Sequence, residues 1–384
     1  MGKIVIIHRQ YSPQSTLKNQ AEAAIAVYDN KVRRLISNHP DYFPLYTERG
    51  KWKHGKESWT NWCEGFLGGQ MWILAKYSDD SFWRSKAEHY SKLLRGREFD
   101  RDVHDLGFTF WPTYRPWYLE TKNPELNEVL VQAGKTMGMR YNPKSRFLRS
   151  FLAEDSTFID IMMNVGIIYY AAEQTNDKNL RDLVDTHVYQ TRRYLVRGDG
   201  STSHEGIFDL NSGVFLRQTT QQGFRDDSSW ARGQAWALYG FGTCYAHTGN
   251  LDFLDAAERT ADFYILRTGN QFVPPNDWDE PNPIVKYESS AAAITASGLM
   301  QLSQLTKDES KSKIYAEYAF KILETILSGD FLSKVDDDWD GVLKHGSYHE
   351  QKRLGVDESV MWGEYFLIEA LDKLLGGNWV ATER

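Results

Sequence analysis

The spacing of apolar residues constrains the fold of this chain more than any other feature. Between Thr16 and Ser37, apolar side chains recur every three or four residues, as they do on one face of an α-helix. Comparable stretches follow along the whole chain and predict roughly a dozen helices, which makes the protein all-α. They begin near Thr60, Ser81, Glu125, Thr157, Lys178, Asp227, Leu251, Ser289, Ser310 and Ser359, and a short helix is expected between Leu106 and Tyr118.

Helix boundaries and loops favour one domain. Asn250 has the residue type of an N-cap, and Gly249 and Gly329 stand where helices are expected to end. No low-complexity linker divides the 384 residues. We therefore expect a single catalytic domain over residues 1–384, with residues 1–15 as an N-terminal extension. The longer polar connections lie at 197–217, 269–286 and 329–355.

So many helices in one domain form either a solenoid or a toroid of helical hairpins. Solenoid repeats carry a fixed sequence period. Here the helix openings that combine Gly with an aromatic residue are unequally spaced, at Gly65–Phe66, Gly233–Trp236 and Gly363–Tyr365. We therefore predict a toroid of six hairpins. Its long connections should lie on one rim, around a cleft lined by aromatic and carboxylate side chains.

Charge and composition exclude several classes of partner. The net charge of −7 argues against nucleic acid or an anionic membrane as the main partner. No apolar run approaches the ~18 residues of a membrane span. The first residues are too short an apolar stretch for a signal peptide, so we expect a cytoplasmic or periplasmic protein. Aromatic residues make up 14% of the chain; most should fill the core, but flat rings also suit a sugar-binding cleft.

No metal or cofactor is expected. Cys63 and Cys244 lie far apart in sequence, and the chain has no C-x-x-C pair of the kind that holds zinc. His345 and His349 have the spacing of a metal-binding pair, but they lack the Glu of H-E-x-x-H and are separated by a Gly-containing loop. His204 lies on another long loop, where a functional role and a solvated side chain are both open.

One carboxylate stands in a helical stretch that is otherwise almost wholly apolar. Asp160 lies in the first turns of this stretch, and Asn164 falls on the same face. One interpretation is a carboxylate that interacts favourably with the helix dipole. The other is a buried carboxyl group with a raised pKa, which a general acid requires. The pattern itself leaves both open.

Two further stretches are candidates for chemistry. Asp105 stands shortly before Gly107, where an Asx-turn or an N-cap is the commoner role of an aspartate. Trp230, Arg232 and Trp236 share one helix opening. A ring and a guanidinium placed this close suit a site that stacks a sugar and binds its carboxylate, while a capped core helix with a surface arginine is the alternative.

Taken together, these stretches resemble the unsaturated glucuronyl hydrolases, glycoside hydrolase family 88. The resemblance is carried by ordered blocks over nearly the whole chain rather than by one motif. The blocks are Trp62 with Gly65–Phe66, His104–Phe108, Asp160–Asn164, Trp230–Trp236, Ser289–Ala293, and Gly355–Ser359 with Trp362–Gly363. Membership of this family implies an (α/α)6 barrel, in agreement with the predicted toroid.

The resemblance also implies an unusual reaction. Polysaccharide lyases leave a 4,5-unsaturated uronic acid at the non-reducing end of their products, and the family hydrates that vinyl ether. Asp160 would act as general acid and base, donating a proton to carbon 4 and then activating water for carbon 5. The resulting hemiketal opens and releases the next sugar. An acid of this kind must still be protonated near neutral pH, which an apolar setting favours.

The other site residues are assigned by the same resemblance. Asp105 matches a second essential aspartate, which contacts sugar hydroxyls and helps to keep Asp160 protonated. The residues expected to bind the uronate are His204, Gln222, Arg232 and Trp236, and those expected to stack on sugar rings are Trp62 and Trp230.

The chain departs from the family pattern in three places. Residues 146–151 offer no Trp before the Asp160 stretch, and Glu288 replaces an aspartate before Ser289. In the loop at 346–354, Lys352 could meet a sulfate, but a solvated charge cluster is expected there.

Three other functions fit the same toroid. They are a conventional two-carboxylate glycosidase, a sugar epimerase with paired histidine bases, and a non-catalytic sugar-binding protein. We expect the family's hydrolase activity instead, on oligosaccharides derived from glycosaminoglycans or similar acidic polysaccharides, with no nucleic-acid or membrane partner.

Overall fold

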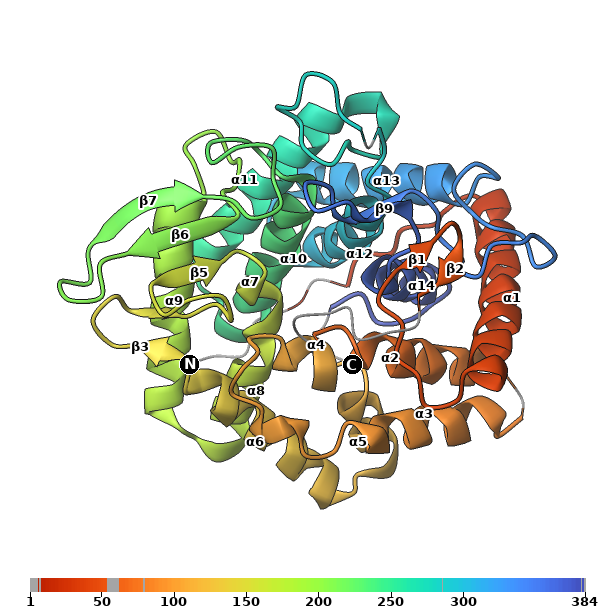
Figure 1. The fold of residues 1–384 in the computed structure, drawn as a ribbon, viewed down its shortest axis with the longest axis horizontal. Coiled ribbons are helices and arrows are strands. Elements are labelled where there is room, and N and C mark those ends of the chain that lie inside the picture. Colours follow the sequence, from red (N-terminus) through yellow and green to blue (C-terminus); the bar gives the residue numbers. More distant parts are fainter. Residues whose placement is uncertain are drawn as a thin grey trace.

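The chain alternates six times between an outer and an inner helix. The computed structural model describes residue 6, residues 8–53, 62–78, 80–284 and 286–380, and residue 382. Within these residues the helices form two concentric rings (Figure 1). The successive outer and inner helices are α1 (Ser15–Asn38) and α2 (Gly65–Leu74), α3 (Phe82–Leu93) and α4 (Leu106–Phe110), α6 (Pro124–Gly138) and α8 (Gly166–Thr175), α9 (Lys178–Leu195) and α10 (Ala231–Thr248), α11 (Leu251–Thr268) and α12 (Ser289–Leu305), and α13 (Glu309–Ile326) and α14 (Met361–Leu374).

Contacts between successive inner helices close the ring. Helix α2 packs on α4, α4 on α8, α8 on α10, α10 on α12, α12 on α14, and α14 returns to α2. Every residue of α12 is buried, whereas the outer helix α9 buries only one face. The outer ring and the neighbouring inner helices together cover α12 on all sides. The predicted six-hairpin toroid, an (α/α)6 barrel, is confirmed.

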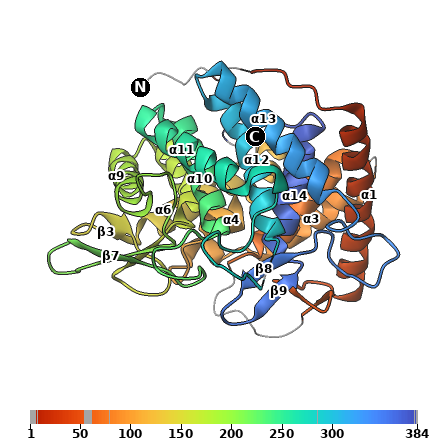
Figure 2. The same cartoon turned by 90° about the horizontal axis from the view of Figure 1, so that it is seen from above.

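Shorter elements complete the rim. The remaining helices are α5 (Tyr114–Thr121), α7 (Ile161–Asn164), and the 3-10 turns η1 (Ala75–Tyr77), η2 (Arg97–Phe99) and η3 (Gly269–Gln271). The strands are β1 (Thr47–Glu48), β2 (Lys51–Trp52), β3 (Tyr141–Asn142), β4 (Phe147–Leu148), β5 (Ser156–Phe158), β6 (Glu205–Phe208), β7 (Phe215–Thr219), β8 (Gly346–His349) and β9 (Leu354–Glu358). They pair antiparallel as β1–β2, β3–β4, β5–β6–β7 and β8–β9. Strands β3, β7, β8 and β9 gather on one side of the toroid (Figure 2). Two of the three long connections thus contain hairpins rather than irregular loops alone.

Two predicted helix starts are wrong. Thr157 lies in β5, because residues 156–158 pair with β6, and the helical residues that follow divide into α7 and α8. Helix α10 starts at Ala231 rather than near Asp227, because Trp230 pairs with Asp277 in an isolated β-bridge and the Ala231 N–H donates to the Asn276 carbonyl at 2.9 Å. In both cases pairing with a distant segment overrides the local preference for helix. The start predicted near Thr60 lies outside the described residues.

Helix ends were predicted with mixed success. Asn250 caps α11 by accepting a hydrogen bond from the Asp252 N–H at 3.0 Å, as expected. Gly249 ends α10 at φ +70°, a conformation that favours glycine. Gly329, by contrast, lies beyond the end of α13, which is capped at Leu327. None of the described helices is both long and apolar enough to cross a bilayer.

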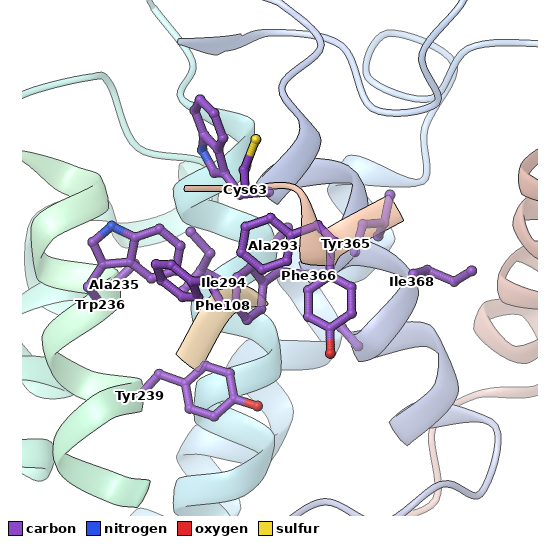
Figure 3. Packing of buried hydrophobic residues seen from close by; sticks show 14 of the residues in the cluster. Cys63, Phe108, Ala235, Trp236, Tyr239, Ala293, Ile294, Tyr365, Phe366 and Ile368 are labelled. Carbon is purple, nitrogen blue, oxygen red and sulfur yellow. The ribbon is translucent and has the colours of Figure 1, made fainter. Parts of the chain in front are cut away.

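Aromatic side chains fill the space enclosed by the inner ring (Figure 3). The ring centroid of Phe108 lies 5.1 Å from that of Trp236 and 5.1 Å from that of Phe66. Phe366 completes the cluster, with its ring centroid 5.4 Å from that of Trp236 and 6.4 Å from that of Phe108. These rings come from four inner helices, so they fix the position of each helix opening relative to the others.

A close approach between α4 and α7 sets the position of the helices that follow Asp105 and Asp160. The Phe108 N–H donates a hydrogen bond to Oδ1 of Asn164 at 2.8 Å, and Nδ2 of Asn164 donates to the Asp160 carbonyl at 3.3 Å. Gly107 makes this approach possible, because a Cβ atom there would lie 2.6 Å from the Asn164 Cα. Asn164 therefore links the segments that carry the two aspartates.

We predict that Gly107→Ala destabilises the protein by about 1–3 kcal/mol, because the added methyl group must push α7 away from α4. Chemical denaturation measures the change. Gly329→Ala is the matched control, since a Cβ there meets nothing within 4 Å. Equal effects of the two substitutions would contradict this account of the α4–α7 contact.

Candidate active site

A cavity of about 310 Å³ opens at the rim where the inner helices begin. Six of the eight residues singled out from the sequence line it, and they are Trp62, Asp105, Asp160, Gln222, Arg232 and Trp236. The other two, His204 and Trp230, are buried directly behind this lining. The remaining lining residues are His104, Phe108, Phe151, Leu152, Phe158, Gln221, Tyr348, His349 and Lys352.

Inner helices and the short helix α7 deliver several of these side chains from their N-terminal ends. Trp62 precedes α2, Asp105 is the N-cap residue of α4, and Asp160 is the N-cap residue of α7. Arg232 lies in the first turn of α10. Neither aspartate uses its carboxylate to cap its own helix. The carboxyl groups are therefore available to the cavity, at helix ends whose partial charge is positive.

Burial sets the protonation state of Asp160. Its side chain is 16% exposed, and removal from water raises the pKa of its carboxyl group to about 6. The positive charge of Arg232 opposes this shift, and the negative charge of Glu205 adds to it. Asp160 is thus a carboxyl group that still holds its proton in mildly acidic solution, as the second interpretation of its sequence setting requires.

Asp105 forms the second half of a coupled pair. Burial raises its pKa well above the usual range, and the like charge of Asp160 raises it further. Nε2 of His104 lies 3.5 Å from Oδ1 of Asp105, and Nδ1 of the same ring accepts a hydrogen bond from the Phe151 N–H at 2.9 Å. Because two nearby carboxylates are costly to ionise together, the site favours a state in which the pair retains a proton.

Arg232 is the fixed cation of the site. One of its terminal nitrogens donates hydrogen bonds to the Gln222 side chain at 2.7 Å and to the Tyr348 carbonyl at 2.7 Å. Its guanidinium lies over the ring of Trp230 at 4.4 Å and over that of Trp362 at 4.9 Å. The Nε atom is buried and has no hydrogen-bond partner among the described residues. The arrangement holds a rigid guanidinium at the wall of the cavity.

The β8–β9 hairpin contributes three lining residues that the sequence reasoning did not assign to the site: Tyr348, His349 and Lys352. Glu288 positions this hairpin, because its carboxylate accepts hydrogen bonds from the Ser347 N–H at 3.1 Å and from the Ala291 N–H at 2.7 Å. Glu288, which stands where the family has an aspartate, therefore caps the N-terminus of α12 and also holds β8 in place. Lys352 is exposed, as expected of a solvated charge, and it also borders the cavity.

The side chains before Asp160 also face the cavity. Phe151 and Leu152 line it, on the segment where a tryptophan was expected and not found. No short motif marked either residue. Apolar side chains such as these carry no sign in the sequence of the cavity that they face, because that depends on how the segment folds.

The histidine pair at 345 and 349 does not form a joint site. His345 contacts the Asp357 carboxylate at 2.6 Å, whereas His349 lines the cavity. Among the described residues, no group of three or more His, Cys, Asp or Glu side chains is placed to hold a metal ion.

Comparisons with known proteins agree with the geometry. The chain is 30% identical over 366 residues to an unsaturated glucuronyl hydrolase of Bacillus sp. (strain GL1), covering 91% of this chain and 96% of that protein. It is 29% identical over 323 residues to an unsaturated chondroitin disaccharide hydrolase of Streptococcus pyogenes serotype M1, covering 81% and 80%. No protein-family model matches the chain.

Solved structures give the same result for the fold. The crystal structure of the Bacillus sp. GL1 unsaturated glucuronyl hydrolase superimposes with a TM-score of 0.88 at 28% identity, over 95% of this chain and 100% of that one. An unsaturated glucuronyl hydrolase specific for heparin superimposes with a TM-score of 0.85 at 28% identity, over 94% and 96%.

Fold and site define a glycoside hydrolase built on an (α/α)6 barrel. Within that class, the chain belongs to the unsaturated glucuronyl hydrolase family, as the ordered sequence blocks indicated.

We predict that Asp160→Asn stabilises the protein at pH 8 and has little effect at pH 4. The pKa of the carboxyl group is raised from 3.8 to about 6, so the folded protein binds this proton more tightly than the unfolded chain does. The stability gained from this tighter proton binding is complete below the pKa of Asp160 in the unfolded chain, and it is lost as the pH rises through about 6. Ionised Asp160 then costs on the order of 3 kcal/mol, which asparagine removes.

Urea unfolding at the two pH values measures the difference. Asp336→Asn, at an exposed position, serves as the control for the loss of one surface charge. A stability gain from Asp160→Asn that is the same at pH 4 and pH 8 would show that burial of the charge is not its cause.

Proposed function

We propose that this protein removes the 4,5-unsaturated uronic acid from the non-reducing end of lyase-generated oligosaccharides by hydrating its double bond. The observation that carries the proposal is a carboxyl group, Asp160, whose pKa burial raises to about 6 inside an aromatic cavity that also presents Arg232. Protonation of carbon in a vinyl ether requires an acid that is still protonated close to neutral pH. Membership of the family supports the same reaction.

In the proposed reaction, Asp160 donates its proton to carbon 4 of the unsaturated ring. The electron pair of the double bond forms the new C–H bond, and positive charge develops at carbon 5 and the ring oxygen. The ionised Asp160 then accepts a proton from a water molecule that attacks carbon 5. The product is a hemiketal, which opens spontaneously and releases the next sugar together with a keto-uronate.

The remaining lining residues have roles that follow from their chemistry. Arg232 pairs with the uronate carboxylate, because it lines the cavity and its guanidinium is the cation that suits a carboxylate. Gln222 holds Arg232 in place. Asp105 binds ring hydroxyls and, through its charge, favours the protonated form of the pair. Trp62 and Trp236 supply flat apolar surface for the sugar rings.

The substrates are expected to be acidic disaccharides. The relatives named above include one that acts on chondroitin disaccharides and one specific for heparin, so unsaturated glycosaminoglycan disaccharides are the first class to test. Lys352 places a cation at the cavity, which gives a reason to include sulfated and unsulfated members of each type.

We predict that the protein abolishes the ultraviolet absorbance of the conjugated double bond in at least one of these disaccharides. Asp160→Asn should fold normally and lose turnover by roughly 10²–10⁴-fold, the usual contribution of a general acid and base. Circular dichroism confirms folding, and the matching saturated disaccharide serves as the control substrate. If the saturated disaccharide is cleaved while the absorbance of the unsaturated disaccharide stays unchanged, the result would instead support a conventional glycosidase.

We predict that Arg232→Lys raises KM for the unsaturated substrate by roughly tenfold, with a smaller effect on kcat. Lysine keeps the positive charge that faces Asp160 but loses the planar fork that binds a carboxylate through two bonds. The methyl ester of the uronate is the diagnostic substrate, since it lacks the carboxylate that Arg232 would bind. If Arg232→Lys weakens binding of the ester as much as that of the acid, the assignment is wrong.

A further inference from the structure

Two buried polar atoms face each other behind the cavity without a hydrogen bond. Oδ1 of Asp160 and Nε2 of His204 are 3.7 Å apart, and neither has a partner among the described residues. Each atom has lost its contact with water, so leaving both unpaired is unfavourable. Because N–H···O bonds are formed at about 2.9 Å, a displacement of under ~1 Å would join them.

The tautomer of His204 is fixed by the backbone. Its Nδ1 lies 3.1 Å from the Gln221 N–H and 3.3 Å from the Gln222 N–H, and it accepts from these donors. A ring nitrogen that accepts carries no proton, so the proton of the neutral ring lies on Nε2. Burial lowers the pKa of His204 to about 3, which keeps the ring neutral. His204 therefore points a single N–H group at Asp160.

The surrounding strands hold His204 in this orientation. The Ile159 N–H donates to the His204 carbonyl at 2.9 Å, which continues the pairing of β5 with β6. This bond places His204 beside Ile159, the residue before Asp160. The imidazole is packed between the rings of Phe158 and Trp230, with centroid distances of 4.7 and 4.5 Å. Its side chain has no exposed surface, so it does not line the cavity itself.

The second carboxyl group of the site is arranged in the same way. His104 accepts the Phe151 N–H at Nδ1 and presents Nε2 to Asp105 at 3.5 Å. Burial lowers the pKa of His104 well below its usual value. Each aspartate of the pair thus has its own neutral histidine, oriented by a backbone amide.

We propose that His204 is a positioning residue for Asp160 rather than a uronate-binding residue. Its Nε2–H bonds Oδ1 of Asp160, so the transferable proton is carried by Oδ2, on the side of the carboxyl group that is open to the cavity. When the Oδ2–H bond breaks and the proton joins the substrate carbon, the same N–H stabilises the carboxylate that remains. This inference rests on the proposed function for its catalytic consequence, but not for the contact itself.

The hydrogen bond should strengthen as Asp160 ionises, because a donor binds a charged oxygen more strongly than a neutral one. Other charged or titratable groups also act on the pair. Asp160 is affected by Arg232 from α10 and Glu205 from β6, and it acts in turn on Asp105 before α4. His204 is affected by Arg232 and by His349 of β8. All of these stay in place when only His204 is changed.

Two substitutions separate the two nitrogens of His204. In His204→Asn the side-chain oxygen can replace Nδ1 as acceptor for the backbone, but nothing replaces Nε2. In His204→Gln the amide nitrogen can reach the position of Nε2, but the acceptor for the backbone is lost. We expect His204→Asn to raise the pKa of Asp160 by about one unit, and His204→Gln to leave it near the wild-type value.

A titration without substrate tests the contact directly. ¹³C NMR of aspartate-labelled protein, with Asp160→Asn to identify the signal, reports the pKa of Asp160 in each variant. His187→Asn is the matched control, since Nδ1 of that buried ring also accepts a backbone N–H, from Leu148 at 3.1 Å, while its Nε2 faces Thr191. An unchanged Asp160 pKa in His204→Asn, or an equal shift in His187→Asn, would overturn the proposal.

Kinetics on an unsaturated disaccharide test the catalytic consequence. His204→Asn should lower kcat by roughly 10–100-fold with KM nearly unchanged, and should move the alkaline limb of the pH profile upwards, with partial recovery in His204→Gln. A higher KM with unchanged kcat and an unchanged pH limb would mean that His204 binds the substrate. If wild-type protein hydrates no unsaturated disaccharide, the proposed function fails, and the titration still decides whether His204 sets the pKa of Asp160.

Discussion

Burial of the inner helices on every side is the constraint on which the rest of the structure depends. A closed ring of such helices leaves no solvent for a polar side chain in the middle of a helix, so unpaired charge can be tolerated only at the helix ends. Where a charge does lie deep inside, it is paired: Lys373 of α14 donates to the Ser297 side chain and carbonyl at 2.8 Å, close to Glu369. The open ends of the inner helices are therefore the natural place for chemistry.

The same constraint explains the electrostatics of the candidate site. Carboxyl groups that stand at helix N-termini are normally ionised and stabilising. Here the aromatic surroundings and the proximity of Asp105 to Asp160 work in the opposite direction, and burial is the larger effect. Arg232 moderates this effect without removing it, because its own positive charge is shared with Glu288 and with carbonyl groups of β8. The site is thus held in a state that costs stability, in a protein whose large core supports it.

Much of the site was readable from particular residues. Asp160 stood out as the one carboxylate in a long apolar stretch, and Arg232 as an arginine between two tryptophans at a helix opening. Each pattern left a structural role open, and the resemblance to the family selected the functional one. His204 and Trp230 were expected at the cavity but lie behind its lining. Spacing along a helix or loop does not tell which of several buried groups reaches the cavity. Tyr348, His349 and Lys352 were not assigned, because a hairpin far along the chain gives no local sign that it folds over the site.

What the sequence determined by itself was the helical toroid: the period of its apolar residues requires helices, and the unequal spacing of the helix openings favours a toroid over a solenoid. The sequence blocks that resemble the family singled out Asp105 and Asp160 as the two aspartates of the site. Only the tertiary structure decided that residues 156–158 pair as a strand, that Asn164 joins the two aspartate-bearing segments, and that His204 lies behind Asp160. Those features depend on hydrogen bonds between residues about 50 positions apart in sequence. Such bonds form only where the assembled fold brings the partners together, and no local pattern encodes them.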